Sequence, residues 1–283
     1  EFSAMLIKKN EKVIDKLEIK NKEEADEILS ELKGAEYTVE NVEKKEEKRN
    51  PFSPFTTSTL QQAAWQKFHF PAKMTMQTAQ RLYEEGHITY HRTDSLNLSE
   101  ISLFAAKKFI EETFGKNYWA GFLRKYKAKG NAQEAHEAIR PTHADRTPDH
   151  LKDIDPRQLK LYTLIWQRFI ACQMAPALFN SISADIKAKD YIFRANGQTL
   201  KFDGFLKIYP TKFEEKTLPD LEKNDQLELT KLDHSQHFTE PPARYNEASL
   251  IKALEKHGIG RPSTYAPTLT TIQTRSYIEK NEQ

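Results

Sequence analysis

The sequence predicts an α+β protein in which a helical, winged-helix-like domain is inserted into a β-rich domain. Short segments of alternating polarity, which are typical of strands, occur near the N-terminus and again between residues 178 and 232. Between these regions, apolar side chains recur at the three- and four-residue spacing of amphipathic helices. We therefore expect an antiparallel β domain of residues 1–49 and 177–245, an inserted helical domain of residues 50–176, and the start of a further helical domain at 246–283.

Bulk composition permits more than one domain and excludes several classes of protein. The 283 residues carry a net charge of only +2, with 30% charged residues, so a nucleic-acid surface must come from local clustering of cations. The single cysteine, Cys172, excludes an intrachain disulfide and a cysteine zinc cluster and is typical of a reducing cytoplasm. No apolar run approaches the ~20 residues of a membrane span. The chain starts and stops without natural punctuation, so we interpret it as part of a longer protein.

The N-terminal region is predicted to contain strands around one helix. Residues 6–20 and 37–42 alternate weakly in polarity, whereas apolar residues within 22–32 fall at helical spacing. The mixed charge run 43–49 is expected to be a solvated face or linker. Pro51 marks the boundary with the helical domain.

Residues 58–92 predict a helix-turn-helix followed by a strand in the position of a wing. The first helix is expected to begin at Ser58 or Thr59, and the second to run from about 73 to 85. The strand at 88–92 follows directly. This order of elements is typical of winged-helix DNA-binding modules. The predicted inward face of the second helix is Met76, Ala79, Leu82 and Tyr83.

Tyr90 and Arg92 are the strongest catalytic candidates. In an extended segment Ile88, Tyr90 and Arg92 would point one way, with the phenol and the guanidinium about 6–7 Å apart along the strand. A phenol has a pKa of ~10, so activation at neutral pH means offsetting about 3 pKa units, or about 4 kcal/mol. Arg92 could contribute to this and could hold a phosphate oxygen. The same spacing also fits a packed tyrosine beside a solvated arginine.

Two helices and a basic segment follow this region. A helix is expected from Asn97 to Thr113, with Glu100 completing a capping box. Residues 116–132 interleave cations and aromatic rings, which suits single-stranded nucleic acid, although a solvated loop with anchoring rings fits equally well. A long core helix is predicted over 155–174. The inward face expected for the first of these helices is Leu98, Ile101, Ala105 and Phe109.

The C-terminal third changes from strands back to helices. Short strands separated by Gly, Asp or Asn are predicted at 179–187, 191–195, 199–202, 205–209 and 226–232. Glu247 to His257 is expected to be a helix, and Pro262 the first residue of another. The free N–H groups at that second N-terminus could cradle a phosphate, together with Arg261, Ser263 and Thr264, but a well-capped helix without a ligand also fits.

The histidines do not predict a metal site. His136 lies in a polar run and, taken alone, is more often a hydrogen-bonded structural residue than a catalyst. His87 and His91 have the four-residue spacing of a helical metal pair, but in an extended chain they would lie about 13 Å apart. No Gly-x-x-x-x-Gly-Lys phosphate loop occurs, so ATP use is not expected.

Several sequence blocks, in order, resemble the type IA DNA topoisomerases. They are PFTTSTLQQA at 54–63, AQRLYE at 79–84, ITYHRTDS at 88–95, QEAHEAIRPT at 133–142, PPARYNEASL at 241–250 and GIGRPSTY at 258–265. The form EAHEAIRP is similar to bacterial topoisomerase I rather than topoisomerase III. The resemblance is strong from about residue 50 to 278 and weak before that.

This resemblance implies an enzyme that relaxes negatively supercoiled DNA without ATP. Tyr90 would attack a phosphodiester of single-stranded DNA, giving a 5′-phosphotyrosine link and a free 3′-hydroxyl that reseals the break after strand passage. Arg92 would stabilise the scissile phosphate, and His136, oriented by Asp94, would assist. The residues expected to hold the DNA backbone are Arg261, Ser263, Thr264 and Arg275.

The resemblance also implies a toroid of four domains, two of them linked through a β-rich arch. Type IA enzymes carry a Toprim domain with a magnesium site of the Asp-x-Asp type. The near match at Asp153 and Asp155 looks like a helix entry, so the Toprim domain is expected to be absent from this chain and Mg²⁺ is not expected to bind here. The expected partners are single-stranded or negatively supercoiled DNA and the Toprim domain of the same protein. We expect a bacterial, cytoplasmic and nucleoid-associated monomer without membrane contact.

The pattern of elements leaves one alternative from a different class, a noncatalytic winged-helix DNA-binding module. Such a module would prefer duplex DNA and would be indifferent to Tyr90→Phe. A type IA enzyme would prefer single strands.

Overall fold

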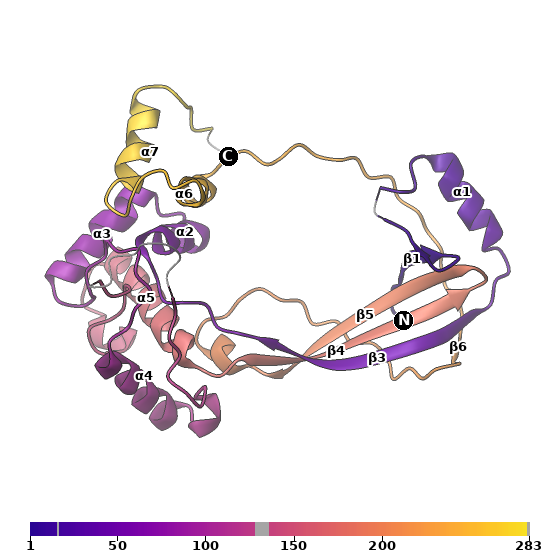
Figure 1. Ribbon diagram of the computed structural model, residues 1–283, viewed down its shortest axis with the longest axis horizontal. Coiled ribbons are helices and arrows are strands. Elements are labelled where there is room, and N and C mark those ends of the chain that lie inside the picture. The colour runs from indigo at the N-terminus through magenta and orange to yellow at the C-terminus, as the bar shows by residue number, and fades with distance from the viewer. Residues whose placement is uncertain (16, 128–135, 282–283) are drawn as a thin grey trace. The chain divides into compact units, whose positions relative to one another are not determined.

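The structure is a computed structural model, and it describes residues 1–15, 17–127 and 136–281. The chain divides into two compact units, each assembled from separated stretches of sequence (Figure 1). The first unit contains residues 1–49, 177–203 and 212–242, and the second contains residues 50–176, 204–211 and 243–283. The first is built on an antiparallel sheet and the second mainly on helices, which confirms the predicted α+β class with an antiparallel sheet. In the described parts of the chain, no helix is both long and apolar enough to cross a membrane.

A six-stranded antiparallel sheet forms the first unit, in the order β2-β1-β5-β4-β3-β6. The long strands β4 and β5 form a hairpin at its centre, and β3 pairs with β4 although the two are far apart in sequence. One helix, α1 (Lys22–Glu31), begins at the Asn21 cap. The strands are β1 (Met5–Lys9), β2 (Lys12–Val13), β3 (Tyr37–Arg49), β4 (Ala177–Ala188), β5 (Tyr191–Phe202) and β6 (Gln226–Leu227).

The core of the first unit lies between α1 and one face of this sheet. Its largest buried side chains include Leu32 just after α1, Tyr37 at the start of β3, and Tyr191 and Phe193 on β5. The rings of Tyr37 and Phe193 are in tilted contact, 6.0 Å apart between centroids. The unit therefore has an apolar core of its own.

The charged run at 43–49, predicted to be a solvated face or linker, is the second half of β3. Its backbone pairs with residues 177–183 of β4. Most of its side chains are exposed on both faces of the strand. The run therefore lacks the alternation of polar and apolar residues by which a half-buried strand is recognised in a sequence. Ion pairs such as Lys201 Nζ to Glu46 Oε2, at 2.6 Å, line this part of the sheet.

Two predicted strands of the C-terminal half were wrong. Residues 205–209 contain the 3₁₀ helix η3 (Gly204–Lys207), and of 226–232 only the two residues of β6 are a strand. The segment at 205–209 has strand-like composition, but its Phe205 N–H donates to the Ala175 carbonyl within the second unit instead of joining the sheet.

The second unit is organised around α5 (Pro156–Gln173), most of whose side chains are buried. Asp155 caps it, because its Oδ1 accepts from the Arg157 and Gln158 amides. Cys172 on this helix is fully buried, as predicted for a core residue, and burial raises the pKa of its thiol to about 12. The other helices are α2 (Thr57–Phe68), α3 (Ala72–Glu84), α4 (Glu100–Thr113), α6 (Glu247–Lys256) and α7 (Tyr265–Thr274), with 3₁₀ turns η1 (Lys116–Tyr118) and η2 (Pro148–Leu151).

Helices α6 and α7 pack against α2 and α3 within the second unit. Ile251 of α6 and Leu269 of α7 share a buried cluster with Ala72 of α3. Two polar contacts tie the same helices together. Ser58 Oγ donates to Glu255 Oε2 at 2.8 Å, and the Ala72 amide donates to Glu247 Oε2 at 2.7 Å, which places a carboxylate at the α3 N-terminus.

The predicted starts of α2 and α4 and the predicted buried face of α4 were wrong, whereas the predicted end of α4 at Thr113 is confirmed. Helix α2 is capped by Thr56 rather than by Ser58 or Thr59, and α4 is capped by Ser99 rather than Asn97. On α4 the buried apolar residues are Leu103, Ala106 and Ile110 rather than the predicted face, of which Ile101 is 84% exposed. Helix α4 carries apolar residues around much of its circumference, so spacing alone does not select the buried face.

The basic and aromatic segment at 116–132 lies only partly within the described residues, since Lys129 falls outside them. In the described part, the Tyr126 hydroxyl donates to the Cys172 carbonyl at 2.8 Å, and the Trp119 backbone bridges to Met174. Burial raises the pKa of the Tyr126 phenol. The Tyr126 side chain and the Trp119 backbone anchor the segment to the helical core, which favours the interpretation as a loop with an anchoring ring.

Candidate active site

The segment that carries Tyr90 follows α3 and is fixed to the chain at 138–141. Gly86 ends the helix with φ +72°, a conformation that favours glycine. Ile88 forms an isolated bridge to Pro141. The Thr89 amide donates to the Arg140 carbonyl at 2.9 Å, and Thr89 Oγ1 donates to the Ala138 carbonyl at 2.8 Å. The predicted strand over 88–92 is therefore wrong beyond that single bridge, and the segment is held by separate backbone hydrogen bonds together with bonds from threonine side chains.

Thr57, the first residue of α2, holds the other side of this segment. Its Oγ1 donates to the His91 carbonyl at 2.7 Å and accepts from the Thr93 amide at 2.9 Å, while its own amide donates to the Thr93 carbonyl at 2.9 Å. Thr57 is fully buried. Sequence reasoning missed this residue and Thr89 as determinants of the site. The available signal for Thr57 was its place in the PFTTSTLQQA block.

Side chains alternate between solvent and core along this segment. Tyr90 is 44% exposed, and Arg92 and Asp94 are also exposed, whereas His91 and Thr93 between them are buried. Tyr90 and Arg92 therefore share the solvent side, as the spacing indicated. Ile88 does not join them, because it is buried.

The Tyr90 ring lies against two other rings. Its centroid is 5.2 Å from that of Tyr83 and 5.3 Å from that of His91, both in edge-on geometry. Tyr83 was predicted to face the core of the second unit, but it is 40% exposed and forms this contact instead. Edge-on ring pairs limit how the phenol can turn.

His91 is fully buried, and neither ring nitrogen has a hydrogen-bond partner within the described chain. Burial, and secondarily the positive charge of Arg92, lower the pKa of His91 from 6.5 to about 4, against a smaller opposite effect of Glu84. The imidazole is therefore neutral at pH 7 and adds no charge beside the tyrosine.

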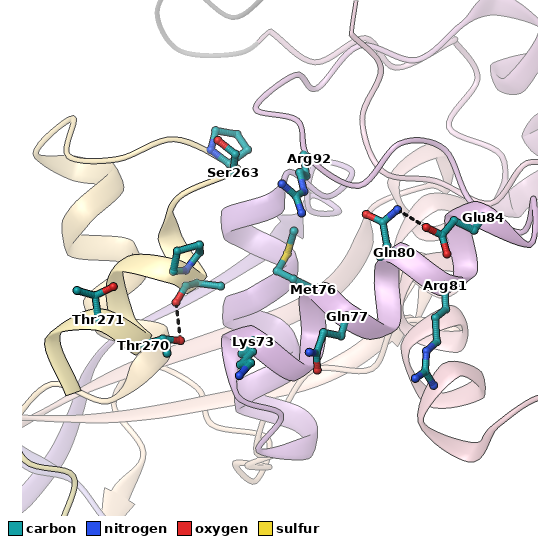
Figure 2. Close-up of a pocket in the computed structure, with 13 residues that line it drawn as sticks. Lys73, Met76, Gln77, Gln80, Arg81, Glu84, Arg92, Ser263, Thr270 and Thr271 are labelled. Atoms are coloured by element: carbon teal, nitrogen blue, oxygen red, sulfur yellow. Dashed lines mark hydrogen bonds between the residues drawn. The ribbon is translucent and has the colours of Figure 1, made fainter. Parts of the chain in front are cut away.

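The structure brings Arg92 and Ser263 to one cleft, formed between α3 and the segment that leads into α7 (Figure 2). The predicted helix start at Pro262 was wrong, because residues 262–264 form a turn and α7 begins at Tyr265. Thr264 Oγ1 accepts from the Arg261 amide at 2.8 Å and so closes that turn.

The other predicted DNA-binding and catalytic residues have different surroundings. Arg261 donates from its guanidinium to the Gly260 carbonyl at 2.8 Å, and Arg275 caps the far end of α7. The pKa of Tyr265 is raised chiefly by burial, with a minor effect of the Asp94 charge, so Asp94 lies in the neighbourhood of the start of α7. His136 is partly buried, and its segment is tied to the Tyr90 segment through Thr89.

The described residues offer no metal site. Within ranges 1–15, 17–127 and 136–281, no three His, Cys, Asp or Glu side chains group in a way that could hold a metal ion. What the site offers is an exposed phenol on a rigid segment with an exposed guanidinium two residues away. This pair can attack a phosphorus centre and stabilise the charge that develops there.

Comparison with known proteins gives consistent matches over almost the whole chain. A family model described as DNA topoisomerase matches residues 2–283. DNA topoisomerase 1 of Pseudomonas aeruginosa is 48% identical over 261 residues, which are 91% of this chain and 30% of that protein. The solved structure of full-length topoisomerase I from Thermotoga maritima matches with a TM-score of 0.79 at 34% identity, covering 99% of this chain and 46% of that one. The chain thus spans less than half the length of either relative.

Proposed function

The chain belongs to the bacterial type IA DNA topoisomerases, and on that premise we propose that it carries the tyrosine half of an active site that relaxes negatively supercoiled DNA. The observation that carries this proposal is the exposed pair Tyr90 and Arg92 on a segment whose neighbouring residues are buried and hydrogen-bonded. A phenol on a segment held by these hydrogen bonds, with an exposed cation two residues away, suits attack on a bound phosphodiester.

The proposed reaction exchanges one ester for another. The Tyr90 phenolate oxygen forms a bond to phosphorus while the bond from phosphorus to the 3′-oxygen breaks, and the 3′-oxygen takes up a proton. A second strand passes through the break, and the 3′-hydroxyl then attacks the phosphotyrosine and releases the phenolate. ATP is not needed, because the phosphotyrosine bond conserves the energy of the phosphodiester and a phenolate leaves more readily than an alkoxide.

The surrounding residues have separate roles in this proposal. Arg92 stabilises the charge on the scissile phosphate, and Ser263, in the same cleft, holds an adjacent part of the backbone. His136 and Asp94 assist at the phosphate, while Arg261, Thr264 and Arg275 hold the strand further away. Of these roles, that of Arg92 has the most direct geometric support.

The domain and partner assignments are part of the same proposal. Residues 1–49 and 177–245 act as the β-rich arch, residues 50–176 as a winged-helix-like domain that carries the nucleophile, and residues 246–283 as the start of a DNA-binding helical domain. In this proposal Mg²⁺ is bound by a Toprim domain of the same protein, and Tyr90 and Arg92 act without a metal ligand from the described side chains. The enzyme would act as a monomer on single-stranded DNA, close to the nucleoid.

A covalent-trapping assay on the full-length protein that carries this sequence tests the proposal. After denaturation in the presence of Mg²⁺, a single-stranded oligonucleotide labelled at its 3′ end should stay attached to the protein, and one labelled at its 5′ end should not. Tyr90→Phe should abolish the adduct while oligonucleotide binding persists. The control Tyr277→Phe removes a hydroxyl from an exposed ring and should leave the adduct intact. An adduct that survives Tyr90→Phe, or preference for duplex without any adduct, would contradict the proposal.

A further inference from the structure

Helix α4 is apolar on two of its faces, and the structure covers only one of them. Leu103, Ala106 and Ile110 pack into the core of the second unit. Ile101 and Phe104 lie on another face and are 84% and 56% exposed. A helix that only covered this core would carry polar residues on its outer side. The second apolar face therefore needs a different explanation.

The exposed apolar face of α4 is a stripe along the helix. Phe104 and Ala105 are three and four residues after Ile101, so both are its neighbours on the helix surface, and all three are exposed. Figure 1 shows α4 at the side of the helical unit opposite α6 and α7. Exposed apolar residues that occur singly are ordinary, whereas a contiguous group is typical of a surface that binds another molecule.

A further exposed ring comes from the segment that passes along α4. This ring belongs to Phe122, which is 57% exposed. Two contacts join the segment to α4, one on each side of Phe122 in the sequence. Lys125 Nζ lies 3.6 Å from Glu100 Oε1. Lys107 Nζ lies over the Trp119 ring, 6.0 Å from its centroid.

These two contacts place Phe104 and Phe122 beside each other. Phe104 is four residues after Glu100 and three before Lys107, so the three side chains share the face of α4 that the segment crosses. Phe122 lies between the two residues of the segment that make the contacts. The α4 patch is the surface formed by Ile101, Phe104, Ala105 and Phe122.

The segment that carries Phe122 is held in place without that ring. The Arg124 amide donates to Gln173 Oε1 at 3.0 Å, and Gln173 Nε2 donates to the Arg124 carbonyl at 2.9 Å. The Tyr126 hydroxyl donates to the Cys172 carbonyl at 2.8 Å. The Phe122 ring is therefore presented on a fixed backbone, which reduces the conformational entropy lost when a partner binds.

The charges beside the α4 patch are mainly positive. The Arg124 guanidinium lies over the Phe122 ring, 5.0 Å from its centroid, and Lys107 and Lys125 are the other cations of these contacts. Glu100 is already paired with Lys125. Among the described residues, Lys107 and Arg124 form no ion pair. A partner that carries carboxylates would therefore complement this surface.

We propose that the α4 patch binds an acidic amphipathic helix of another protein, with the apolar side chains of that helix on the patch and its carboxylates at Lys107 and Arg124. The stripe spans about 6 Å of α4, at a rise of about 1.5 Å per residue, and Phe122 widens it. This size suits the few apolar anchors, spaced three and four residues apart, by which such a helix binds. The proposal does not depend on the reaction of Tyr90.

Single-stranded DNA fits the α4 patch less well than such a helix does. Ile101 and Ala105 have no ring on which a base could stack. Glu100 and Glu111 lie on the same side of α4 as the exposed phenylalanine, and their charges oppose a continuous phosphate backbone. A peptide can instead place single carboxylates at the two unpaired cations.

Binding of a designed peptide to the full-length protein that carries this sequence tests the proposal. The probe is a fluorescently labelled helical peptide with Leu and Phe on one face and Glu on the other, and its anisotropy is measured. We expect saturable binding that is about tenfold weaker in Phe104→Ser and in Phe122→Ser, because each removes an anchoring ring. The control Phe238→Ser removes an exposed ring from the first unit and should leave the affinity unchanged.

An exchange of charge tests the electrostatic part of the proposal. A peptide with Lys in place of Glu should bind wild-type protein about tenfold more weakly than the acidic peptide. Lys107→Glu combined with Lys125→Glu should reverse that preference. This exchange keeps the proposal testable if a serine variant fails to fold. Covalent trapping through Tyr90 should proceed in the serine variants as in wild type, which shows that the second unit is intact.

Three results with the peptides would overturn the proposal. They are the absence of saturable binding by the acidic peptide, equal binding of both peptides to wild-type protein, and equal losses in Phe122→Ser and Phe238→Ser. A result with DNA would overturn it as well. If Phe122→Ser weakens binding of a single-stranded oligonucleotide and leaves the peptide unaffected, the α4 patch serves DNA.

Discussion

The buried imidazole of His91 makes the region around Tyr90 sensitive to acid. Its pKa is lowered from 6.5 to about 4 in the folded protein, chiefly by burial, with Arg92 on the same segment and Glu84 on α3 as the nearby charges. Between these two values the unfolded chain binds more protons than the folded one, so the free energy of unfolding falls as pH drops from 6.5 toward 4. His91→Leu removes this titration. As pH is lowered from 7 to 5, we expect the free energy of unfolding of the variant to rise by up to about 2 kcal/mol relative to that of wild type.

Tryptophan fluorescence during denaturation measures this prediction. Trp65, Trp119 and Trp166 are the three tryptophans of the chain, and all lie in the second unit with His91. Carboxylates titrate in both proteins and cancel in the comparison. The exposed His143→Leu serves as the control and should show no such relative gain. Equal behaviour of the two variants would mean that His91 is not held as a buried neutral ring.

At the scale of single residues, the sequence pointed to candidate side chains for the chemistry but did not predict which residues hold their backbone in place. Tyr90 and Arg92 could be chosen because the ITYHRTDS block resembles the type IA topoisomerases, whereas their spacing alone also fits a packed tyrosine beside a solvated arginine. Thr57 could not be chosen, because its contacts to His91 and Thr93 join residues more than 30 positions apart. Ser263 was predicted as part of a capped helix end, yet the structure places it on a turn that faces Arg92.

Helix α5 is followed by a close backbone contact that depends on one glycine. Gly204 has φ +47°, and a Cβ at this position would come within 3.0 Å of the carbonyl oxygens of Ala175 and Pro176. Backbone atoms cannot move aside as a flexible side chain can. We expect Gly204→Ala to lower the free energy of unfolding of the second unit by about 2–3 kcal/mol or more, combining left-handed strain with overlap. Gly258→Ala is the control, because it has φ +69° but nothing within 4 Å, and should cost about 1 kcal/mol. If both variants lost the same free energy of unfolding, the left-handed backbone conformation alone would account for the cost, and the overlap at Gly204 would contribute nothing.

Elements were predicted well where one physical signal dominated and poorly where two competed. Helix α5 was placed almost to the residue, because Asp155 and Pro156 start it and a long apolar face continues it. The second half of β3 was missed, because its charged side chains are exposed on both faces and its strand form depends on pairing with β4. The wing strand was over-predicted, because β-branched and aromatic residues at 88–92 are held instead by Thr57 and Thr89.

The whole chain combines two units whose cores are separate although their sequences are interleaved. Ile186 on β4 belongs to the core of the first unit and Leu161 on α5 to that of the second, and both are almost fully buried. Truncating either to alanine should cost about 2–5 kcal/mol in its own unit. We expect Leu161→Ala to shift the tryptophan-monitored transition, which reports only the second unit, and Ile186→Ala to leave that transition in place.

Hydrogen exchange followed by mass spectrometry completes this test. Ile186→Ala should increase exchange in β4 and β5 while α5 stays protected, and Leu161→Ala should do the reverse. A loss of α5 protection in Ile186→Ala would show that the two units unfold as one. Separate unfolding would instead mean that the β-rich unit can unfold while the segment that carries Tyr90 and Arg92 keeps its geometry.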